Sequence, residues 1–198
     1  MALVGDQHVV RTNRIIGTNV GIMLSGVPEL GNGRNWLVDG NTIDDPTVGI
    51  DALSYAANHR LRNLNNEVDG IGWGIFVTNL EVSGGEIQTQ TRPTNEQHTN
   101  FRVRRLNSAG IGAVSIRGRN PRLTQIEIHS LFFAADAVEL AHTRGARINK
   151  LVAVNEVAEF GGSGVLLIDA ENTTITNSSI VGFQHTVSVI RSSGLQAR

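Results

Sequence analysis

Short apolar segments recur along the chain at nearly regular intervals. A six-residue unit begins and ends with an apolar residue and carries four mostly polar or turn-forming residues between them. Its clearest copies are Val38–Ile43, Val82–Ile87, Phe101–Leu106, Ile126–Leu131, Val152–Val157 and Ile175–Ile180. Weaker copies end at Ile16 and Leu64, so the units follow one another every 19 to 27 residues. A repeat of this length is typical of a solenoid, in which each repeat stacks on its neighbours.

A second short apolar segment follows most of these units. These segments are rich in β-branched residues, which favour strands. No helical period of 3.6 residues lies between them, which argues against a βαβ fold. They are Ile22–Leu24, Ile50–Leu53, Ile75–Val77, Val114–Ile116, Val138–Leu140, Val165–Ile168 and Val187–Ile190.

Two short strands per repeat predict an all-β protein, a right-handed parallel β-helix of about eight coils, as a single domain over residues 1–198. One coil cannot bury its apolar residues alone, whereas coils stacked about 4.8 Å apart pair each strand with its copies above and below. The alternative is an antiparallel β-sandwich, which needs hairpin turns roughly every 8–12 residues. The Asp-Gly pairs at 39–40 and 69–70 lack well-alternating strands on both sides.

Composition excludes several classes of function. Hydrophobic residues make up 40% of the chain and 22 residues are glycine, which suits a turn-rich β protein. The net charge of −1 gives no overall field that would attract nucleic acid. There is no cysteine and no metal-ligand spacing among the six histidines, so we expect no metal and no cofactor. No apolar run is long enough to span a membrane, and we recognise no signal peptide at the start.

Two segments carry a resemblance to a known family. Asn172–Gly182 and Asn41–Asp44 resemble coils of the pectate-lyase-like right-handed β-helix superfamily, which includes pectate lyases, polygalacturonases, alginate epimerases and phage tailspikes. The resemblance, which covers roughly residues 10–191, implies a polysaccharide partner. It also implies a place outside the cytoplasm, in a virion or on a cell surface, in an assembly similar to a tail fibre or spike.

The catalytic motifs of that superfamily are not found in full. The paired aspartates and Gly-His-Gly of polygalacturonases are not both matched, and the Asp-Pro-His-Glu of alginate epimerases is absent. Catalytic residues therefore stay unassigned and enzymatic activity stays open. Three hypotheses remain: a module that binds polysaccharide, a polysaccharide lyase or glycoside hydrolase of tailspike type, and a purely structural subunit that assembles with itself.

Arginines provide the candidate ligand-binding residues. Aligning the repeat units places Arg60 and Arg62 one coil away from the small coil around Gly84, and Arg102 and Arg104 one coil beyond it. The two pairs would form a shallow basic trough that binds the carboxylates of an acidic polysaccharide through bidentate contacts.

Two further features bear on this trough. The polar stretch Thr89–Asn100, which includes Arg92, interrupts the repeat beside it and is a candidate binding loop. The alternative for the arginines is ordinary surface ion pairing, such as Arg102 with Glu127 on the next coil.

The ends of a solenoid leave strands without partners unless something covers them. We see no amphipathic capping helix before Val9, and only eight residues follow Ile190. The sequence therefore predicts a homo-oligomer, either a trimer or an end-to-end stack. The alternative is a short coil folded over each end.

Overall fold

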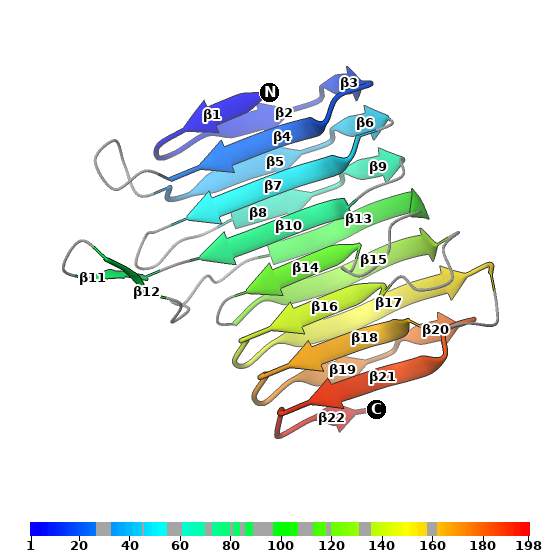
Figure 1. Ribbon diagram of the computed structural model, residues 1–198. Coiled ribbons are helices and arrows are strands. Elements are labelled where there is room, and N and C mark those ends of the chain that lie inside the picture. The colour runs from blue at the N-terminus through cyan, green and yellow to red at the C-terminus, as the bar shows by residue number, and fades with distance from the viewer. Residues whose placement is uncertain are drawn as a thin grey trace.

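The chain folds into stacked parallel strands, as the computed structural model shows (Figure 1). It describes residues 1–198 apart from 27–32, 45, 55–60, 70–72, 80, 84–85, 89–96, 107–112, 118–119, 131–135 and 158–161. For residues 54, 73–79, 81–83, 86–88, 97–98 and 100–106 it describes the backbone alone. All of the regular secondary structure in the described part is β-strand. That part contains no helix long and apolar enough to cross a membrane.

One eight-stranded sheet, sheet A, forms one side of the solenoid. Its strands are all parallel and in stacking order are β1 (Ala2–Val4), β4 (Val20–Ser25), β7 (Val48–Ser54), β10 (Trp73–Asn79), β14 (Val114–Arg117), β16 (Val138–Ala141), β18 (Ser163–Ile168) and β21 (His185–Ile190).

Sheet B faces sheet A and has a bend in every coil. Its main stack is β2 (Val9–Arg11), β5 (Trp36–Asp39), β8 (Leu61–Leu64), β13 (Gln97–Leu106), β15 (Arg122–Ser130), β17 (Arg147–Asn155), β19 (Thr174–Thr176) and β22 (Gln196–Ala197). Beyond the bend lie β3 (Arg14–Ile16), β6 (Thr42–Asp44), β9 (Glu67–Asp69) and β20 (Ser179–Val181). The long strands β13, β15 and β17 run through the bend and pair on both sides of it.

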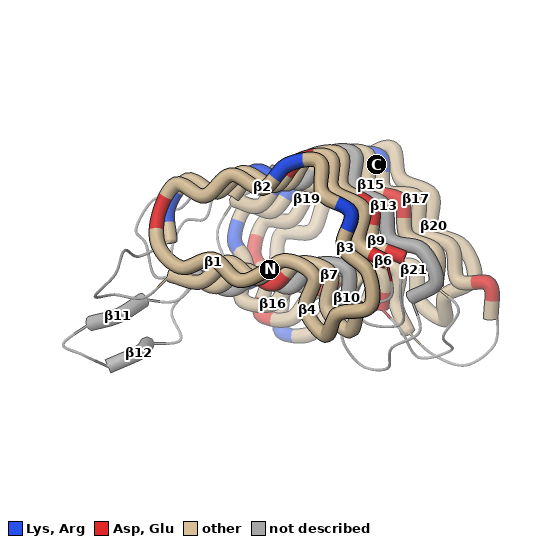
Figure 2. The backbone as a smooth tube through the Cα atoms, turned by 90° about the horizontal axis from the view of Figure 1, so that it is seen from above, with Lys and Arg blue, Asp and Glu red and all other residues tan. Residues whose placement is uncertain are grey.

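The winding is right-handed, as predicted. In Figure 1 the chain descends from the N-terminus while the front strands of sheet A run to the left and the strands of sheet B behind them run to the right. The view from above in Figure 2 shows the successive coils lying nearly on top of one another. The prediction of an all-β parallel β-helix is therefore confirmed.

The solenoid has about five turns, so the predicted count of about eight coils is wrong, and one predicted repeat unit is not a coil. Val82–Ile87 belongs to an antiparallel hairpin of β11 (Glu81–Ser83) and β12 (Glu86–Gln88), which lies apart from both sheets in Figure 1. In a tight hairpin, two apolar residues flank a short run of polar and turn-forming residues. The six-residue repeat unit has the same local pattern, so the sequence did not distinguish the two.

The register also moves several predicted units. Ile43, Val68 and Val103 share one column, and Ile128 and Ala153 continue it. The true units are therefore Leu123–Ile128 and Ile148–Ala153, which begin three and four residues before the predicted Ile126–Leu131 and Val152–Val157. Val38–Ile43 and Ile175–Ile180 were placed in the observed register.

Positive-φ residues shape the bend in sheet B. Six coils place a left-handed residue at the same point, directly after the first strand segment: Thr12, Gly40, Asn65, Gln125, Lys150 and Asn177, with φ between 51° and 64°. A left-handed residue turns the chain sharply, and asparagine and glycine tolerate it best. The bend turns the next side chain towards the interior.

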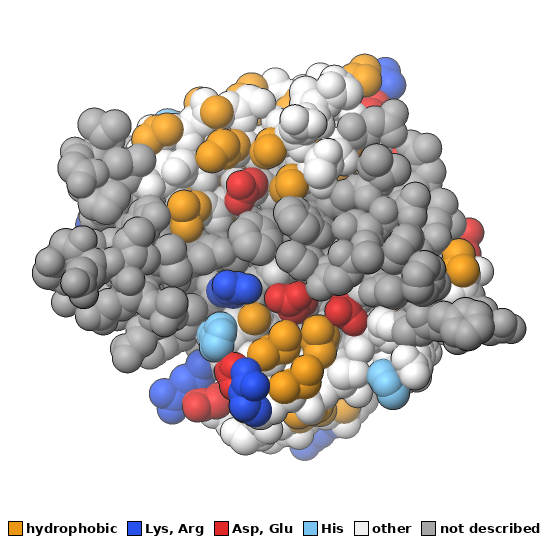
Figure 3. Space-filling model, viewed as in Figure 1, with side chains coloured by type: hydrophobic (Ala, Val, Ile, Leu, Met, Phe, Trp, Pro, Cys, Tyr) orange, Lys and Arg blue, Asp and Glu red, His pale blue; other side chains and the backbone are white. Residues whose placement is uncertain are grey.

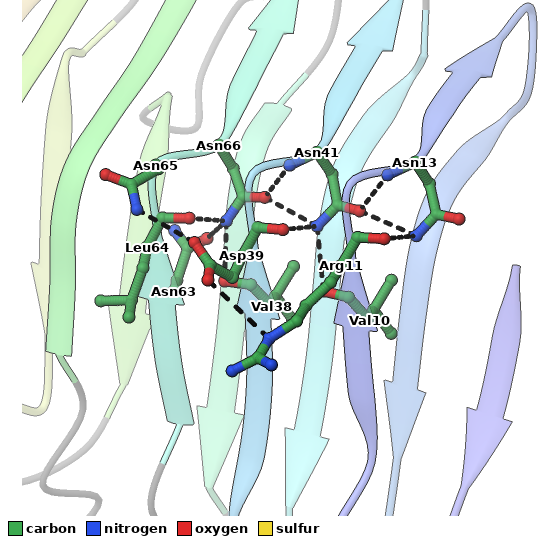
Figure 4. Close-up of polar contacts among 10 residues, drawn as sticks. All are labelled: Val10, Arg11, Asn13, Val38, Asp39, Asn41, Asn63, Leu64, Asn65 and Asn66. Atoms are coloured by element: carbon green, nitrogen blue, oxygen red, sulfur yellow. Dashed lines mark hydrogen bonds and ion pairs between the residues drawn. The ribbon is translucent and has the colours of Figure 1, made fainter.

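Three asparagines fill that interior position in the first coils (Figure 4). The Asn41 Oδ1 accepts hydrogen bonds from the backbone N–H of Asn13 at 3.0 Å and from its Nδ2 at 2.9 Å. The Asn66 Oδ1 accepts the same two bonds from Asn41, at 2.7 and 2.8 Å. Asn41 and Asn66 are each 1% exposed, so this asparagine ladder satisfies buried polar groups coil by coil.

Apolar side chains take over the same position farther along. Phe101, Ile126 and Leu151 are paired in register, and Ile126 and Leu151 are buried. In the following coil the Ser178 Oγ accepts a hydrogen bond from the Leu151 N–H at 3.2 Å, as an asparagine oxygen does in the ladder. One structural position is therefore filled by asparagine in three successive coils, by apolar residues in the next three, and by a serine in the coil after them.

A column of small residues lets the two sheets approach each other. Gly21, Gly49, Ala113, Ala137 and Gly164 take equivalent places at the start of sheet A strands. A Cβ on Gly21 would lie 2.5 Å from Ile43 Cγ2 and 2.7 Å from the carbonyl oxygen of Gly49. The large side chains from the end of each sheet B unit occupy the space that these small residues leave.

We predict that Asn41→Ala lowers the free energy of unfolding by about 3 kcal/mol, because it leaves buried donors and acceptors on both neighbouring coils without partners. Urea denaturation followed by circular dichroism measures the change. Asn13→Ala is the matched control, since it removes the partly exposed end of the ladder and should cost about 1 kcal/mol. Equal costs for the two variants would show that the ladder does not act as a continuous unit.

We predict that Gly21→Ala lowers the free energy of unfolding by about 2–3 kcal/mol, because the new methyl group meets a backbone carbonyl and a buried isoleucine. The control is Gly17→Ala. Gly17 has a φ of 63° and nothing within 4 Å of an added Cβ, so only the backbone cost of about 1 kcal/mol applies. A Gly21→Ala cost no greater than the control would contradict the close contact between the sheets.

Candidate functional site

The five predicted arginines lie in three different situations. Arg60 and Arg92 lie outside the described residues. Arg62 is exposed on β8, in the part of sheet B that precedes the bend. Arg102 and Arg104 lie on β13 beyond the bend, where the backbone alone is described.

The register separates Arg62 from Arg102. Arg102 pairs with Glu67 on one neighbouring strand and with Glu127 on the other, and Arg104 pairs with Asp69. Oppositely charged residues on adjacent strands are an arrangement typical of ion-pair ladders. Among the described arginines of the predicted trough, the structure therefore places Arg62 in a different column from Arg102 and Arg104.

Arg62 instead shares a column with two arginines that the sequence analysis did not select. Arg62 pairs with Gln97, Gln97 with Arg122, and Arg122 with Arg147. All three arginines are exposed. A signal for them was present, since each directly precedes a buried residue at the first position of the true repeat unit: Asn63, Leu123 and Ile148. We call Arg62, Arg122 and Arg147 the arginine column.

These arginines have no ion-pair partner among the residues that the structure describes. Other arginines do: Arg14 lies 3.2 Å from an Asp44 oxygen, and Arg191 lies 2.7 Å from an Asp169 oxygen. At that second pair, the hydrogen bond from the Arg191 guanidinium lowers the pKa of Asp169. Among the described residues, the positive charge of the arginine column is therefore not neutralised by an ion pair.

A second outward column runs beside the arginines, two residues along each strand. Thr124, Asn149 and Thr176 are in register there and half-buried. The Thr176 hydroxyl donates to Asn149 Oδ1 at 3.2 Å, and the Asn177 Nδ2 donates to the same oxygen at 3.0 Å. Exposed Lys150 lies at the bend beyond this column. Hydroxyl, amide and cationic groups thus share the outer face of β15, β17 and β19.

The outer face of sheet A has a different character (Figure 3). Asp51, Ser115 and Glu139 are in register, with the backbone of Phe76 between Asp51 and Ser115, and these three side chains face outward. Ser115 is fully buried and Glu139 is 6% exposed, although both point away from the interior of the solenoid. Acidic side chains lie near the middle of this face in Figure 3.

Burial raises the pKa of three carboxyl groups on this side. It raises the pKa of Asp51. It also raises the pKa of Asp136, although hydrogen bonds from Ser163, including its N–H at 2.6 Å, oppose the rise. Burial raises the pKa of Glu139 as well, with a smaller contribution from the nearby Asp136 charge, whereas the Ser115 hydroxyl at 3.3 Å and Arg117 lower it.

Asp136 and Glu139 are therefore neighbouring carboxyl groups whose burial raises the pKa of each. Glycoside hydrolysis uses a pair of carboxyl groups, one protonated as the general acid and one ionised as the base or nucleophile. The sequence analysis missed the pair, because the two acids lie three residues apart around a strand start and belong to no recognised motif. Within the described part of the chain, no group of three or more histidine, aspartate or glutamate residues could hold a metal ion.

Comparison with known proteins gives no match: no family model, no curated protein and no solved structure resembles this chain at a significant level.

We predict that Glu139→Gln raises the free energy of unfolding at pH 7 relative to the unchanged protein. Because the folded pKa of Glu139 is raised, the stability that its protonated form contributes is complete below the unfolded pKa and is lost as the pH rises through the folded value. Glutamine keeps an acceptor for Ser115 and has no charge to bury, so the advantage should shrink towards pH 4. Thermal unfolding at both pH values measures it.

The control for this prediction is Glu171→Gln, at an exposed carboxylate 3.4 Å from Arg144. It should not gain stability at pH 7. If Glu139→Gln lowers the free energy of unfolding at both pH values, burial of the ionised Glu139 carboxylate does not destabilise the protein.

Proposed function

We propose that this protein is a polysaccharide-binding β-solenoid module of a virion or cell-surface assembly similar to a tail fibre or spike. The observation that carries the proposal is the outer face of sheet B, where hydroxyl, amide and arginine side chains repeat in register from coil to coil. A polysaccharide is itself a repeating chain of hydroxyl-bearing units, so a periodic row of donors and acceptors can contact successive sugars in the same way.

Kinship with the pectate-lyase-like superfamily is part of this proposal. Parallel stacking of short strands supports it, but a shared fold does not determine function, so the argument rests on the exposed face. An extracellular or virion location belongs to the proposal as well. So does association with further copies, for which the edge strands β1 and β21 offer backbone groups that no described strand pairs with on the outer side.

A second candidate function is hydrolysis of the polysaccharide. The observation that favours it is the Asp136–Glu139 pair, since a carboxyl group with a raised pKa is a better candidate for a general acid than an ordinary one. The low exposure of Glu139 ranks this candidate below binding, because a catalytic acid must reach the glycosidic oxygen.

We predict that Thr124→Tyr weakens polysaccharide binding at least tenfold, because a large ring in the middle of the outer face of sheet B blocks close approach of a sugar chain. Binding is measured by calorimetry against a panel of purified neutral and acidic polysaccharides, with a reducing-end assay on the same mixtures. Tyrosine suits an outward strand position, so the fold should persist.

Met23→Tyr is the matched control, because Met23 is an outward residue of sheet A, 39% exposed. It should bind as the unchanged protein does. Loss of binding in Met23→Tyr alone would move the site to sheet A, and release of reducing ends would favour the hydrolase. Absence of binding across the panel would overturn the proposal and leave a structural subunit.

A further inference from the structure

We infer that the arginine column selects a linear polyanion, so that the ligand is a polysaccharide bearing carboxylate or sulfate groups. This inference rests on the proposed function and names the chemistry of its ligand. It depends on where Arg62, Arg122 and Arg147 lie relative to one another, on their freedom from other partners, and on the groups beside them.

The arginine column runs along the solenoid axis. Arg122 and Arg147 lie on adjacent strands, which places their Cα atoms about 4.8 Å apart. Arg62 lies two strands from Arg122, with Gln97 between them, and so about 10 Å away. A ligand that contacts all three must extend across several coils, which suits a chain of repeating charged units better than one compact anion.

Like charges directly opposite each other on neighbouring strands are destabilising. The direct pairing of Arg122 with Arg147 is such a contact, and no described carboxylate lies in their column to offset it. Arg11, in contrast, pairs in register with Asp39, and their side chains lie 3.8 Å apart. Asp44 and Asp69 are also like-charged neighbours in register, but Arg14 lies 3.2 Å from an Asp44 oxygen and offsets that contact. An anion bound between Arg122 and Arg147 would offset the repulsion between these two side chains.

The net charge of the chain shows that only a local group of positive side chains can attract an anion. The net charge is −1, so an acidic ligand gains nothing from the protein's overall charge. Attraction must come from the arginine column and from Lys150, which is exposed at the bend one strand position beyond Asn149. The buried acids Asp136 and Glu139 belong to sheet A and not to this face.

The guanidinium group adds geometry to the charge. Its planar fork can donate two parallel hydrogen bonds to one carboxylate or sulfate group. Because each arginine stands on a strand paired on both sides, its Cα position is fixed. The neighbouring Thr124 and Asn149 can bond sugar hydroxyls, so the two columns together would read an acidic group and a hydroxyl group on one sugar chain.

The test compares three purified polymers by calorimetry: polygalacturonate, which carries carboxylates, dextran sulfate, which carries sulfates, and neutral dextran. We expect polygalacturonate or dextran sulfate to bind and dextran to bind at least tenfold more weakly. Arg122→Gln/Arg147→Gln should weaken binding of the charged polymer about 100-fold, because each lost charge-assisted contact accounts for about tenfold. Raising the salt concentration should weaken the unchanged protein more than this variant.

The control variant is Arg14→Gln, which also removes one positive charge but lies beyond the bend and is paired with Asp44. It should change binding less than twofold. Arg122→Lys/Arg147→Lys keeps both charges and loses both forks, so it should bind between the unchanged protein and the glutamine variant.

The outcomes separate this inference from the proposed function. Equal binding of dextran and the charged polymers, or binding that survives Arg122→Gln/Arg147→Gln, overturns the inference while polysaccharide binding stands. Failure of all three polymers and of the wider panel overturns both. A response to dextran sulfate but not polygalacturonate, or the reverse, supports the inference and identifies the anionic group.

Discussion

In-register parallel pairing between successive coils is the constraint on which the rest of this structure depends. No coil has enough apolar surface to hold itself together, so each strand relies on the strands before and after it for its backbone hydrogen bonds. Pairing in register also places chemically equivalent positions in straight columns. Every feature of functional interest here, from the asparagine ladder to the arginine column, is a column of this kind.

In a column that faces inward, each side chain needs suitable partners on the coils before and after it: hydrogen-bonding groups for a polar residue and apolar groups for an apolar one. Asn41 can be buried only because Asn13 and Asn66 lie on either side of it, and Ile126 can be buried only among other apolar groups. A single asparagine within the apolar stretch would leave its amide without partners. This explains why asparagine occupies the interior position in three successive coils and apolar residues occupy it in the next three, before Ser178, and why the small residues facing Ile43 and Ile180 also recur.

The fold class could be predicted because apolar spacing and the absence of a helical period are local properties of the sequence. Register could not, since the same six-residue pattern fits several alignments when the inward position at the bend is itself apolar, as Ile126 and Leu151 are. Three of the clear predicted units are shifted, because Phe101–Leu106 moves to His98–Val103 as well. Separately, the hairpin around Val82 has the same local pattern as a coil. The register ambiguity also decided the site: with the register wrong, Arg62 was grouped with Arg102, and Arg122 and Arg147 went unnoticed.

Columns that face outward carry no such requirement for continuity, and they are therefore where function can reside. On sheet A the outward residues Ser115 and Glu139 are buried, so a ligand cannot reach them. Burial also raises the pKa of Glu139, which means that its ionisation lowers the stability of the fold. On sheet B the arginines are exposed and free of partners among the described residues, so their charge is open to a ligand. Sheet A therefore holds Ser115 and Glu139 inaccessible, whereas sheet B leaves its arginines available. Among the described residues, the outer face of sheet B repeats hydroxyl, amide and cationic groups over neighbouring coils, and for that reason we propose sheet B as the face that recognises a repeating polymer.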